Sequence, residues 1–139
     1  MAAKQEVAAG AVVYDSEIKK YLLLKHRQGH WAFAQGKPEG DEKLSETLVR
    51  ELKEETGLSI NKSFGPVCEV VYKFSYRRKK VVKTVKFWAV LAKGKVRISS
   101  EHKGYLWASY KEAKRLLRFK NHTDSLSAAR KELKKQKLL

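Results

Sequence analysis

Three glutamates, Glu51, Glu54 and Glu55, occupy positions i, i+3 and i+4 of a segment rich in helix-forming residues. On a helix this spacing puts the carboxylates on one face, where like charges repel one another. A divalent cation would neutralise them, and oxygen ligands without paired histidine or cysteine favour Mg²⁺ or Mn²⁺ over Zn²⁺. Because Mg²⁺ commonly shares its ligand shell with phosphates, the spacing indicates phosphate chemistry. A solvated helix face is the alternative explanation of the same pattern.

Charge is distributed unevenly along the chain. Its 139 residues include 31 Lys and Arg against 15 Asp and Glu, a net charge of +16. Residues 39–55 have seven acids and three bases, whereas residues 73–97 have ten bases and no acid. This contrast indicates a cation site that faces an anion site, and the basic excess favours an anionic partner, a nucleotide polyphosphate or a nucleic acid. Solubility or thermal stability is a second explanation of the excess.

The elements that must position these groups follow from the apolar pattern. Residues 44–56 predict a helix, in which Leu48 and Leu52 supply a packing face and Gly57 ends the helix. Glycine and proline predict an irregular loop over 29–41. A basic turn over 76–80 is expected to join two strands in a long hairpin. Strands are predicted at 6–14, 20–26, 67–75, 81–92 and 104–107, and further helices at 111–117 and 123–133. The mixture favours an α/β layer architecture, and the length predicts a single domain over residues 1–139.

Composition excludes several classes of protein. No apolar run approaches the roughly 20 residues of a membrane span, and the first residues lack the apolar stretch of a secretory signal. A single cysteine, Cys68, excludes an internal disulfide and a cysteine-based zinc site, and we expect it to be a small buried hydrophobe. We therefore expect a cytoplasmic, monomeric protein that does not associate with membranes.

A longer spacing surrounds the three glutamates. Gly36 is followed by five residues, Glu42, seven further residues and the run Arg50–Leu58 (RELKEETGL). Over these 23 positions the segment resembles the signature of the Nudix hydrolases. The resemblance implies an α/β/α sandwich around a mixed β-sheet. It also implies hydrolysis of a nucleoside diphosphate linked to another group, with a divalent metal held on the signature helix.

The same resemblance implies a role for each matching residue. Arg50 corresponds to an arginine that steadies the glutamates, and Glu42 to a supporting position rather than to the general base. The implied metal ligands are Glu51, Glu54, Glu55 and the carbonyl of Gly36.

Segments outside the signature resemble one subgroup of the family, the asymmetrical diadenosine tetraphosphate hydrolases. They are Gly29–Trp31, Tyr76 with Lys83–Trp88, and Ser100–Trp107 with Phe119. The likeness extends over about residues 8–130 and implies Mg²⁺-dependent attack of a metal-bound water that releases ATP and AMP. The substrate-binding residues that it implies are Tyr76 and Phe119 for the adenine, and Lys83 and His30 for phosphate. Glu101 is implied to approach the metals, and either Glu51 or Glu101 to be the general base.

Departures from the family pattern keep other functions open. Gln35 stands where a lysine is expected near the phosphates, and a Gln-Gly pair is closer to the RNA pyrophosphohydrolases and to the plant-type dinucleoside polyphosphate hydrolases. The net charge of +16 adds to the case for an RNA substrate. An RNA 5′ end is therefore the second candidate substrate, beside an oxidised nucleoside triphosphate. A catalytically inactive RNA-binding module is a further alternative, although all three signature glutamates are present. Ordinary packing is the alternative role for Tyr76 and Phe119.

Overall fold

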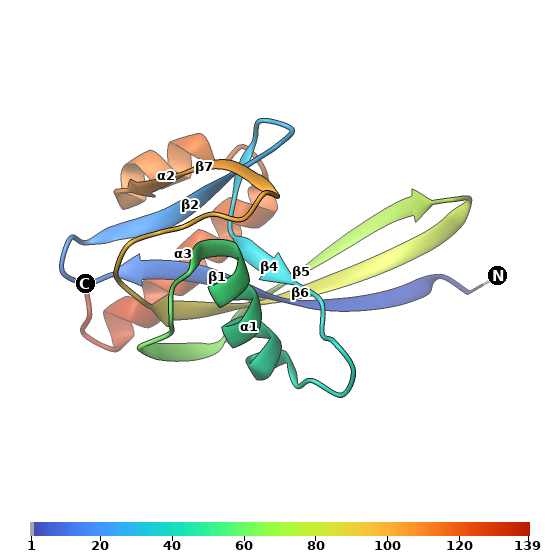
Figure 1. Cartoon of the computed structure of the whole chain (residues 1–139), viewed down its shortest axis with the longest axis horizontal. Coiled ribbons are helices and arrows are strands. Elements are labelled where there is room, and N and C mark those ends of the chain that lie inside the picture. Colours follow the sequence, from blue (N-terminus) through green and yellow to red (C-terminus); the bar gives the residue numbers. More distant parts are fainter. Residues whose placement is uncertain (1) are drawn as a thin grey trace.

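The computed structural model describes residues 2–139 as a curved seven-stranded mixed sheet with helices on both faces (Figure 1). The strands are β1 (Lys4–Asp15), β2 (Lys20–His26), β3 (Trp31–Ala32), β4 (Ala34–Gly36), β5 (Lys62–Tyr76), β6 (Lys79–Leu91) and β7 (His102–Ala108). The helices are α1 (Leu44–Thr56), α2 (Tyr110–Leu116) and α3 (Lys120–Lys135). The predicted α/β sandwich is confirmed. No helix within residues 2–139 has the length and apolarity needed to cross a membrane.

Strand β1 lies at the centre of the sheet, whose order is β3-β2-β1-β6-β5. It runs parallel to β6 from Lys4 to Tyr14 and antiparallel to β2 and β4. Strand β4 pairs with the middle of β1, where Gly36 lies opposite Ala9. This pairing fixes the start of the segment that leads into α1, so the signature helix is positioned from the centre of the sheet.

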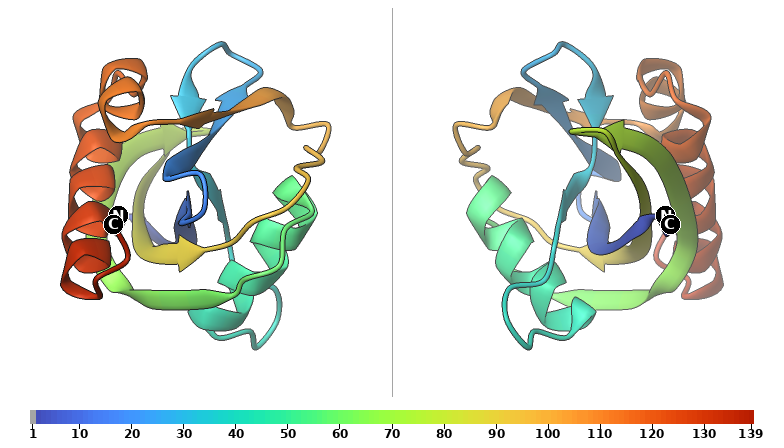
Figure 2. Two further views of the ribbon diagram at one scale, coloured as in Figure 1. Left: turned by 90° about the vertical axis from the view of Figure 1, so that its left-hand side faces the viewer. Right: turned by 90° about the vertical axis from the view of Figure 1, so that its right-hand side faces the viewer.

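The two faces of the sheet bury separate apolar clusters. Helix α1 covers one face with Leu48 and Leu52, which pack in a cluster that includes Trp88. Helix α3 covers the other face, where Leu126 and Leu133 join the cluster around Phe87. Figure 2 shows α1 and α3 on opposite sides of the curved sheet. Both helices follow the predicted apolar spacing, because burial of that stripe is what holds each helix on the sheet.

Several predicted boundaries are wrong. The loop predicted over 29–41 contains two short strands, β3 and β4, because their backbones pair with β2 and β1. Helix α3 begins at Lys120 rather than at residue 123. The predicted turn over 76–80 shrinks to Arg77 and Arg78, since Tyr76 still pairs with Lys79.

The expected burial of Cys68 is only partial. Its Sγ lies 3.8 Å from the Ser125 hydroxyl.

Candidate active site

Helix α1 carries a carboxylate into the protein. Leu48 and Leu52 are almost fully buried, and Glu55 lies seven residues after Leu48, two turns further along the same stripe. The packing that buries the leucines therefore also draws Glu55 inward, leaving it only 5% exposed. The helix ends directly afterwards, because Gly57 adopts a left-handed φ of 76° and its N–H donates to the carbonyl of Lys53.

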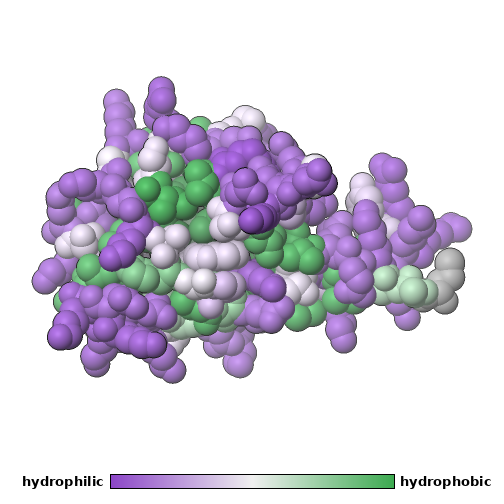
Figure 3. Space-filling model, turned by 90° about the horizontal axis from the view of Figure 1, so that it is seen from below, coloured by the Kyte–Doolittle hydropathy of each residue, from purple (hydrophilic) through white to green (hydrophobic). Residues whose placement is uncertain are grey.

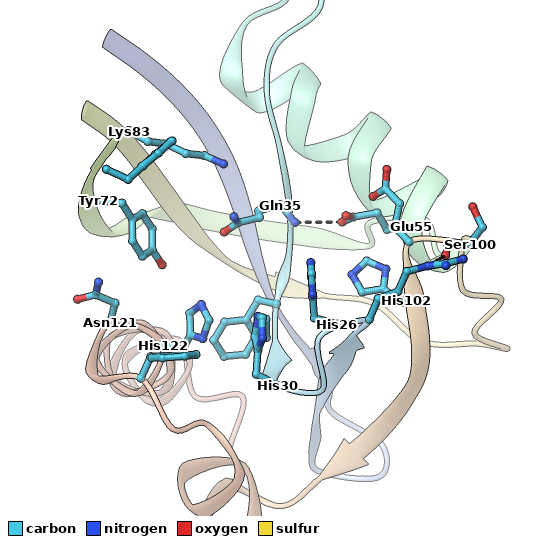
Figure 4. A pocket seen from close by; sticks show the side chains of 16 residues that line it. His26, His30, Gln35, Glu55, Tyr72, Lys83, Ser100, His102, Asn121 and His122 are labelled. Atoms are coloured by element: carbon cyan, nitrogen blue, oxygen red, sulfur yellow. Dashed lines mark hydrogen bonds between the residues drawn. The ribbon is translucent and has the colours of Figure 1, made fainter. Parts of the chain in front are cut away.

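The Glu55 carboxylate is held by the backbone of β4. The N–H of Gln35 donates to Glu55 Oε2 over 3.0 Å (Figure 4). Burial is the main cause that raises the pKa of Glu55 to about 8, and the nearby charges of Glu51 and Glu101 contribute to this rise. Glu55 is thus a carboxyl group for which the site supplies too little positive charge.

Glu51 approaches β4 at Gly36. A Cβ atom at position 36 would lie 2.0 Å from the Cδ of Glu51, which is far inside van der Waals contact. Glycine is therefore the residue that leaves room for this carboxylate beside the strand. Burial raises the pKa of Glu51, while its hydrogen bond to Arg50 opposes that shift.

Arg50 connects the acidic side chains to one another. It binds both oxygens of Glu42, with Nε–Oε2 at 2.7 Å and Nη2–Oε1 at 2.9 Å. Its Nη1 donates to Glu51 at 2.9 Å and to Glu54 at 3.1 Å, and its Nη2 donates to the carbonyl of Lys37 at 2.9 Å. The Arg50 hydrogen bonds hold the pKa of Glu42 down at about 2. This geometry gives Glu42 and Arg50 a positioning role, tying the loop after β4 to α1.

The C-terminal end of α1 brings a further carboxylate to the site. The last carbonyls of a helix lack partners within the helix. Here the N–H of Arg97 donates to the Thr56 carbonyl and the N–H of Ser99 to the Glu55 carbonyl. Arg27 Nε then binds the carbonyl of residue 100 at 2.6 Å. These bonds anchor the loop before β7, so Glu101 reaches the same cavity as Glu55.

The donor chemistry of this cluster fits a divalent cation. Glu51, Glu55 and Glu101 supply hard oxygen atoms, and the charges of Glu51 and Glu101 add to the raised pKa of Glu55, so added positive charge would relieve the cluster. Within residues 2–139, no three histidine, cysteine, aspartate or glutamate side chains lie close enough together to hold a metal ion as they stand. The Glu54 side chain is 55% exposed and is held by Arg50.

One cavity of about 970 Å³ joins these carboxylates to an aromatic region. All four histidines of the chain line it. Its carboxylate end includes Gln35, Glu55 and Glu101, and its other walls include Phe33, Tyr72, Phe74, Lys83, Phe119, Asn121 and the histidines. Figure 4 shows labelled side chains around the cavity that come from α1 (Glu55), from α3 (His122) and from the sheet (Lys83). The cavity can therefore hold a ligand with an anionic part and a planar, apolar part.

Rings meet edge to face at the aromatic end. Phe119 lies 5.6 Å from His30 and 5.9 Å from His122, at interplanar angles of 82° and 84°. His30 also stacks on His26 with ring centroids 4.7 Å apart. Phe119 is 52% exposed, so one of its faces is free to cover a planar group.

Two imidazoles carry unused polar atoms. The Nδ1 atoms of His102 and His122 are buried and lack hydrogen-bond partners among the described residues. Burial lowers the pKa of both side chains, so the neutral imidazole is favoured at neutral pH. The Nδ1 atom of each ring can then donate a hydrogen bond to a ligand that enters the cavity, or accept one from it.

Most of the sequence-predicted site residues meet at this cavity. His30, Gln35, Lys83, Glu101 and Phe119 line it together with Glu55. Burial lowers the pKa of Lys83, and the charge of Lys37 contributes.

Among the predicted substrate-binding residues, Tyr76 is the one that does not line the cavity. It lies at the end of β5, 59% exposed, with the Arg77 guanidinium 5.3 Å from its ring. Tyr72 and Phe74 line the cavity instead. Alternation along a strand places Tyr72, Phe74 and Tyr76 on one face, and this pattern could have indicated Tyr72 and Phe74 as site residues. His26, Arg27, Asn121 and His122 were also missed, and no local motif distinguishes them.

Comparison with known proteins places this arrangement in one family. A family profile described as NUDIX domain matches residues 4–133. The mouse Bis(5'-nucleosyl)-tetraphosphatase [asymmetrical] is 31% identical over 111 residues, which cover 76% of this chain and 75% of the relative. The corresponding pig protein is 32% identical over 113 residues, covering 77% of this chain and 76% of its own. A C. elegans Ap4A hydrolase binary complex superposes with a TM-score of 0.72 at 21% identity, covering 94% of this chain and 98% of the other. This last likeness concerns the fold alone.

Proposed function

This chain belongs to the NUDIX family and is a Nudix hydrolase, and from that premise we propose that it cleaves diadenosine tetraphosphate asymmetrically into ATP and AMP. The observation that carries the proposal is the single cavity whose one end is acidic and whose other end is aromatic. A nucleoside held at the aromatic end would extend its polyphosphate toward Glu55 and Glu101. The similarity to the mouse and pig tetraphosphatases supports the same substrate class.

The acidic end is proposed to hold Mg²⁺, for which Mn²⁺ can substitute. The ligands would be Glu51, Glu54, Glu55, Glu101 and the Gly36 carbonyl. When bound, a divalent cation neutralises phosphate oxygens and acidifies water. Arg50 keeps Glu51 in place, and Glu51 and Glu101 are the carboxylates proposed to accept the proton of the attacking water.

The remaining walls are proposed to hold the substrate. Lys83 would bind the polyphosphate, because its ammonium lies in the cavity, and His30 would assist. Phe119 would cover the adenine against the neighbouring imidazoles. Water then attacks a phosphorus distal to the bound adenosine, and the bond from that phosphorus to the leaving nucleotide breaks. The protein contributes chiefly position and charge, as phosphoryl transfer requires.

Competition among substrates tests this proposal. In one buffer with Mg²⁺, kcat/KM is measured for diadenosine tetraphosphate, 8-oxo-dGTP, ADP-ribose and a 5′-triphosphorylated RNA, with products separated by chromatography. We expect the dinucleotide to lead by about a hundredfold or more and to yield ATP and AMP, a difference of roughly 2.7 kcal/mol in transition-state binding. Symmetric cleavage to ADP, or a lead by another substrate, contradicts the proposal.

A 5′-triphosphorylated RNA is the second candidate substrate in that assay. Gln35 favours it, because this neutral side chain lines the cavity where the family pattern has lysine. If the RNA has the highest kcat/KM, we attribute its preference over the dinucleotide to Gln35 in place of the lysine.

Removal of divalent cations should abolish hydrolysis. We expect EDTA to lower turnover at least about 10³-fold and Mg²⁺ or Mn²⁺ to restore it, since charge neutralisation by a metal contributes several kcal/mol. Mg²⁺ should also raise the melting temperature of the wild type but not that of Glu51→Gln, because binding to the folded state stabilises it. Full turnover in EDTA would rule out the metal site.

Phe119→Ala should weaken substrate binding. We expect KM to rise about 5- to 100-fold with a smaller change in kcat, because a stacked base contributes roughly 1–3 kcal/mol. Tyr105→Ala is the matched control, since Tyr105 is an exposed aromatic, 44% accessible, that does not line the cavity. Equal KM values for the two variants would remove Phe119 from the base site.

A further inference from the structure

An aromatic row leads out of the cavity along β5. Tyr72, Phe74 and Tyr76 alternate along the strand and so share one face of it. Tyr72 and Phe74 line the cavity, whereas Phe74 is 43% and Tyr76 59% exposed. The row therefore begins inside the cavity and ends on the open surface of the projecting hairpin (Figure 1). We call the hairpin segment of residues 73–82 the arm.

The arm is strongly basic. Residues 73–80 are all exposed, and no acidic residue occurs in the arm. Its five bases are Lys73, Arg77, Arg78, Lys79 and Lys80. Figure 3 shows mainly hydrophilic side chains over the part of the molecule that projects from the body. A surface of this sign is complementary to a polyanion.

Strand register sets basic side chains beside the aromatic row. Tyr76 pairs with Lys79, and Tyr72 pairs with Lys83. Paired residues on antiparallel strands project from the same face, so a lysine flanks the row at both ends. At the outer end the Arg77 guanidinium also lies 5.3 Å from the Tyr76 ring. Rings and cations thus share one side of the arm.

The turn of the arm keeps two arginines in an unfavourable backbone conformation. Arg77 and Arg78 have φ values of 51° and 65°. Two-residue hairpin turns with positive φ at both positions favour Asn-Gly or Asp-Gly, because a bulky side chain is strained there. The sequence nevertheless has two guanidinium groups at the end of the row.

We propose that this face of the arm binds single-stranded nucleic acid. Bases would stack on Phe74 and Tyr76, and phosphates would contact Lys79, Arg77 and Arg78. Single strands are bound by rings that stack on bases beside a positive track. A duplex hides the faces of its bases, and an acidic peptide has no bases to stack, so neither uses the whole surface. Phe74 also lines the cavity, but the surface extends beyond it to Tyr76 and the turn, and binding of RNA here involves no turnover.

Binding is measured by fluorescence anisotropy with a labelled single-stranded RNA of about 12 nucleotides that carries a 5′ hydroxyl, in EDTA. The tip variant is Arg77→Asn with Arg78→Gly, which suits the turn while removing two charges. Its matched control is Lys134→Gln with Lys135→Gln, which removes two exposed charges from the last turn of α3. The third variant, Tyr76→Thr, removes a ring without changing charge.

The variants should differ in both affinity and salt dependence. We expect the tip variant to weaken binding about tenfold or more and to lower the slope of log K against log salt by about 1.4, since each phosphate contact contributes roughly 0.7. The control pair should weaken binding by less than about twofold. Tyr76→Thr should weaken binding at least about fivefold with an unchanged slope, because stacking is not ionic.

Three results would overturn the inference. Equal losses in the tip variant and the α3 control would mean that overall charge alone attracts the RNA. Unchanged affinity in Tyr76→Thr would exclude stacking on the arm. A duplex of the same sequence that binds as tightly as the single strand would show that exposed bases are not recognised. Melting temperatures of all variants establish that each one is folded.

Discussion

Glu55→Gln is expected to lower kcat for diadenosine tetraphosphate at least about 10²-fold while the chain stays folded. The amide has nearly the same shape, and its oxygen can still accept the hydrogen bond that Gln35 N–H now donates to Glu55 at 3.0 Å. What the change removes is negative charge at the deepest point of the acidic end. Single-turnover kinetics in saturating Mg²⁺ measure the loss.

Glu17→Gln is the control for this change, because Glu17 is an exposed glutamate whose partner, Lys93, lies at 2.6 Å. It should leave kcat within about twofold, as surface substitutions usually do. Turnover of Glu55→Gln within tenfold of the wild type would remove Glu55 from the mechanism.

The same variant should change how stability depends on pH. The pKa of Glu55 rises from 4.5 in the unfolded chain to about 8 in the folded one, chiefly through burial. The folded state therefore binds the proton more tightly, and stability falls as pH rises between these two values. In EDTA, Glu55→Gln should lack this fall, so its melting temperature should exceed that of the wild type above pH 8. If the melting temperatures of the wild type and of Glu55→Gln change in parallel from pH 4 to 9, the raised pKa of Glu55 is contradicted.

Gly36→Ala should have a comparably large effect for a steric reason. The added Cβ would lie 2.0 Å from the Cδ of Glu51, so the carboxylate must move away from β4. A displacement of about 1 Å in a catalytic group can lower turnover about 10²-fold. We expect that loss in kcat, together with a weaker response of activity to Mg²⁺.

Gly10→Ala separates displacement of the site from general destabilisation. Its Cβ would lie 2.4 Å from Cε1 of Phe87, a buried core residue on the sheet. Overpacking of this kind costs about 1–3 kcal/mol of stability. Below its melting temperature Gly10→Ala should keep kcat within about threefold, and equal losses in both variants would show that Gly36→Ala acts through stability alone.

Local patterns in the sequence predicted the parts of the site that lie on one element. Helix α1 has the predicted bounds, because Leu48, Leu52 and Gly57 set its buried face and its end through neighbours within one or two turns. The same periodicity put Glu51, Glu54 and Glu55 on one side of the helix. It did not distinguish buried Glu55 from exposed Glu54, since that difference depends on how α1 packs on the sheet.

Tertiary structure alone decided which distant residues meet. His26, His102 and His122 come from β2, β7 and α3, and no spacing in the sequence relates them. Tyr76 fell outside the cavity because the turn closed at two residues, which extended β5 and carried this ring onto the arm. Helical spacing is fixed by hydrogen bonds between residues a few positions apart. Contacts between distant residues depend instead on strand register and sheet curvature, which are set only when the whole chain is packed.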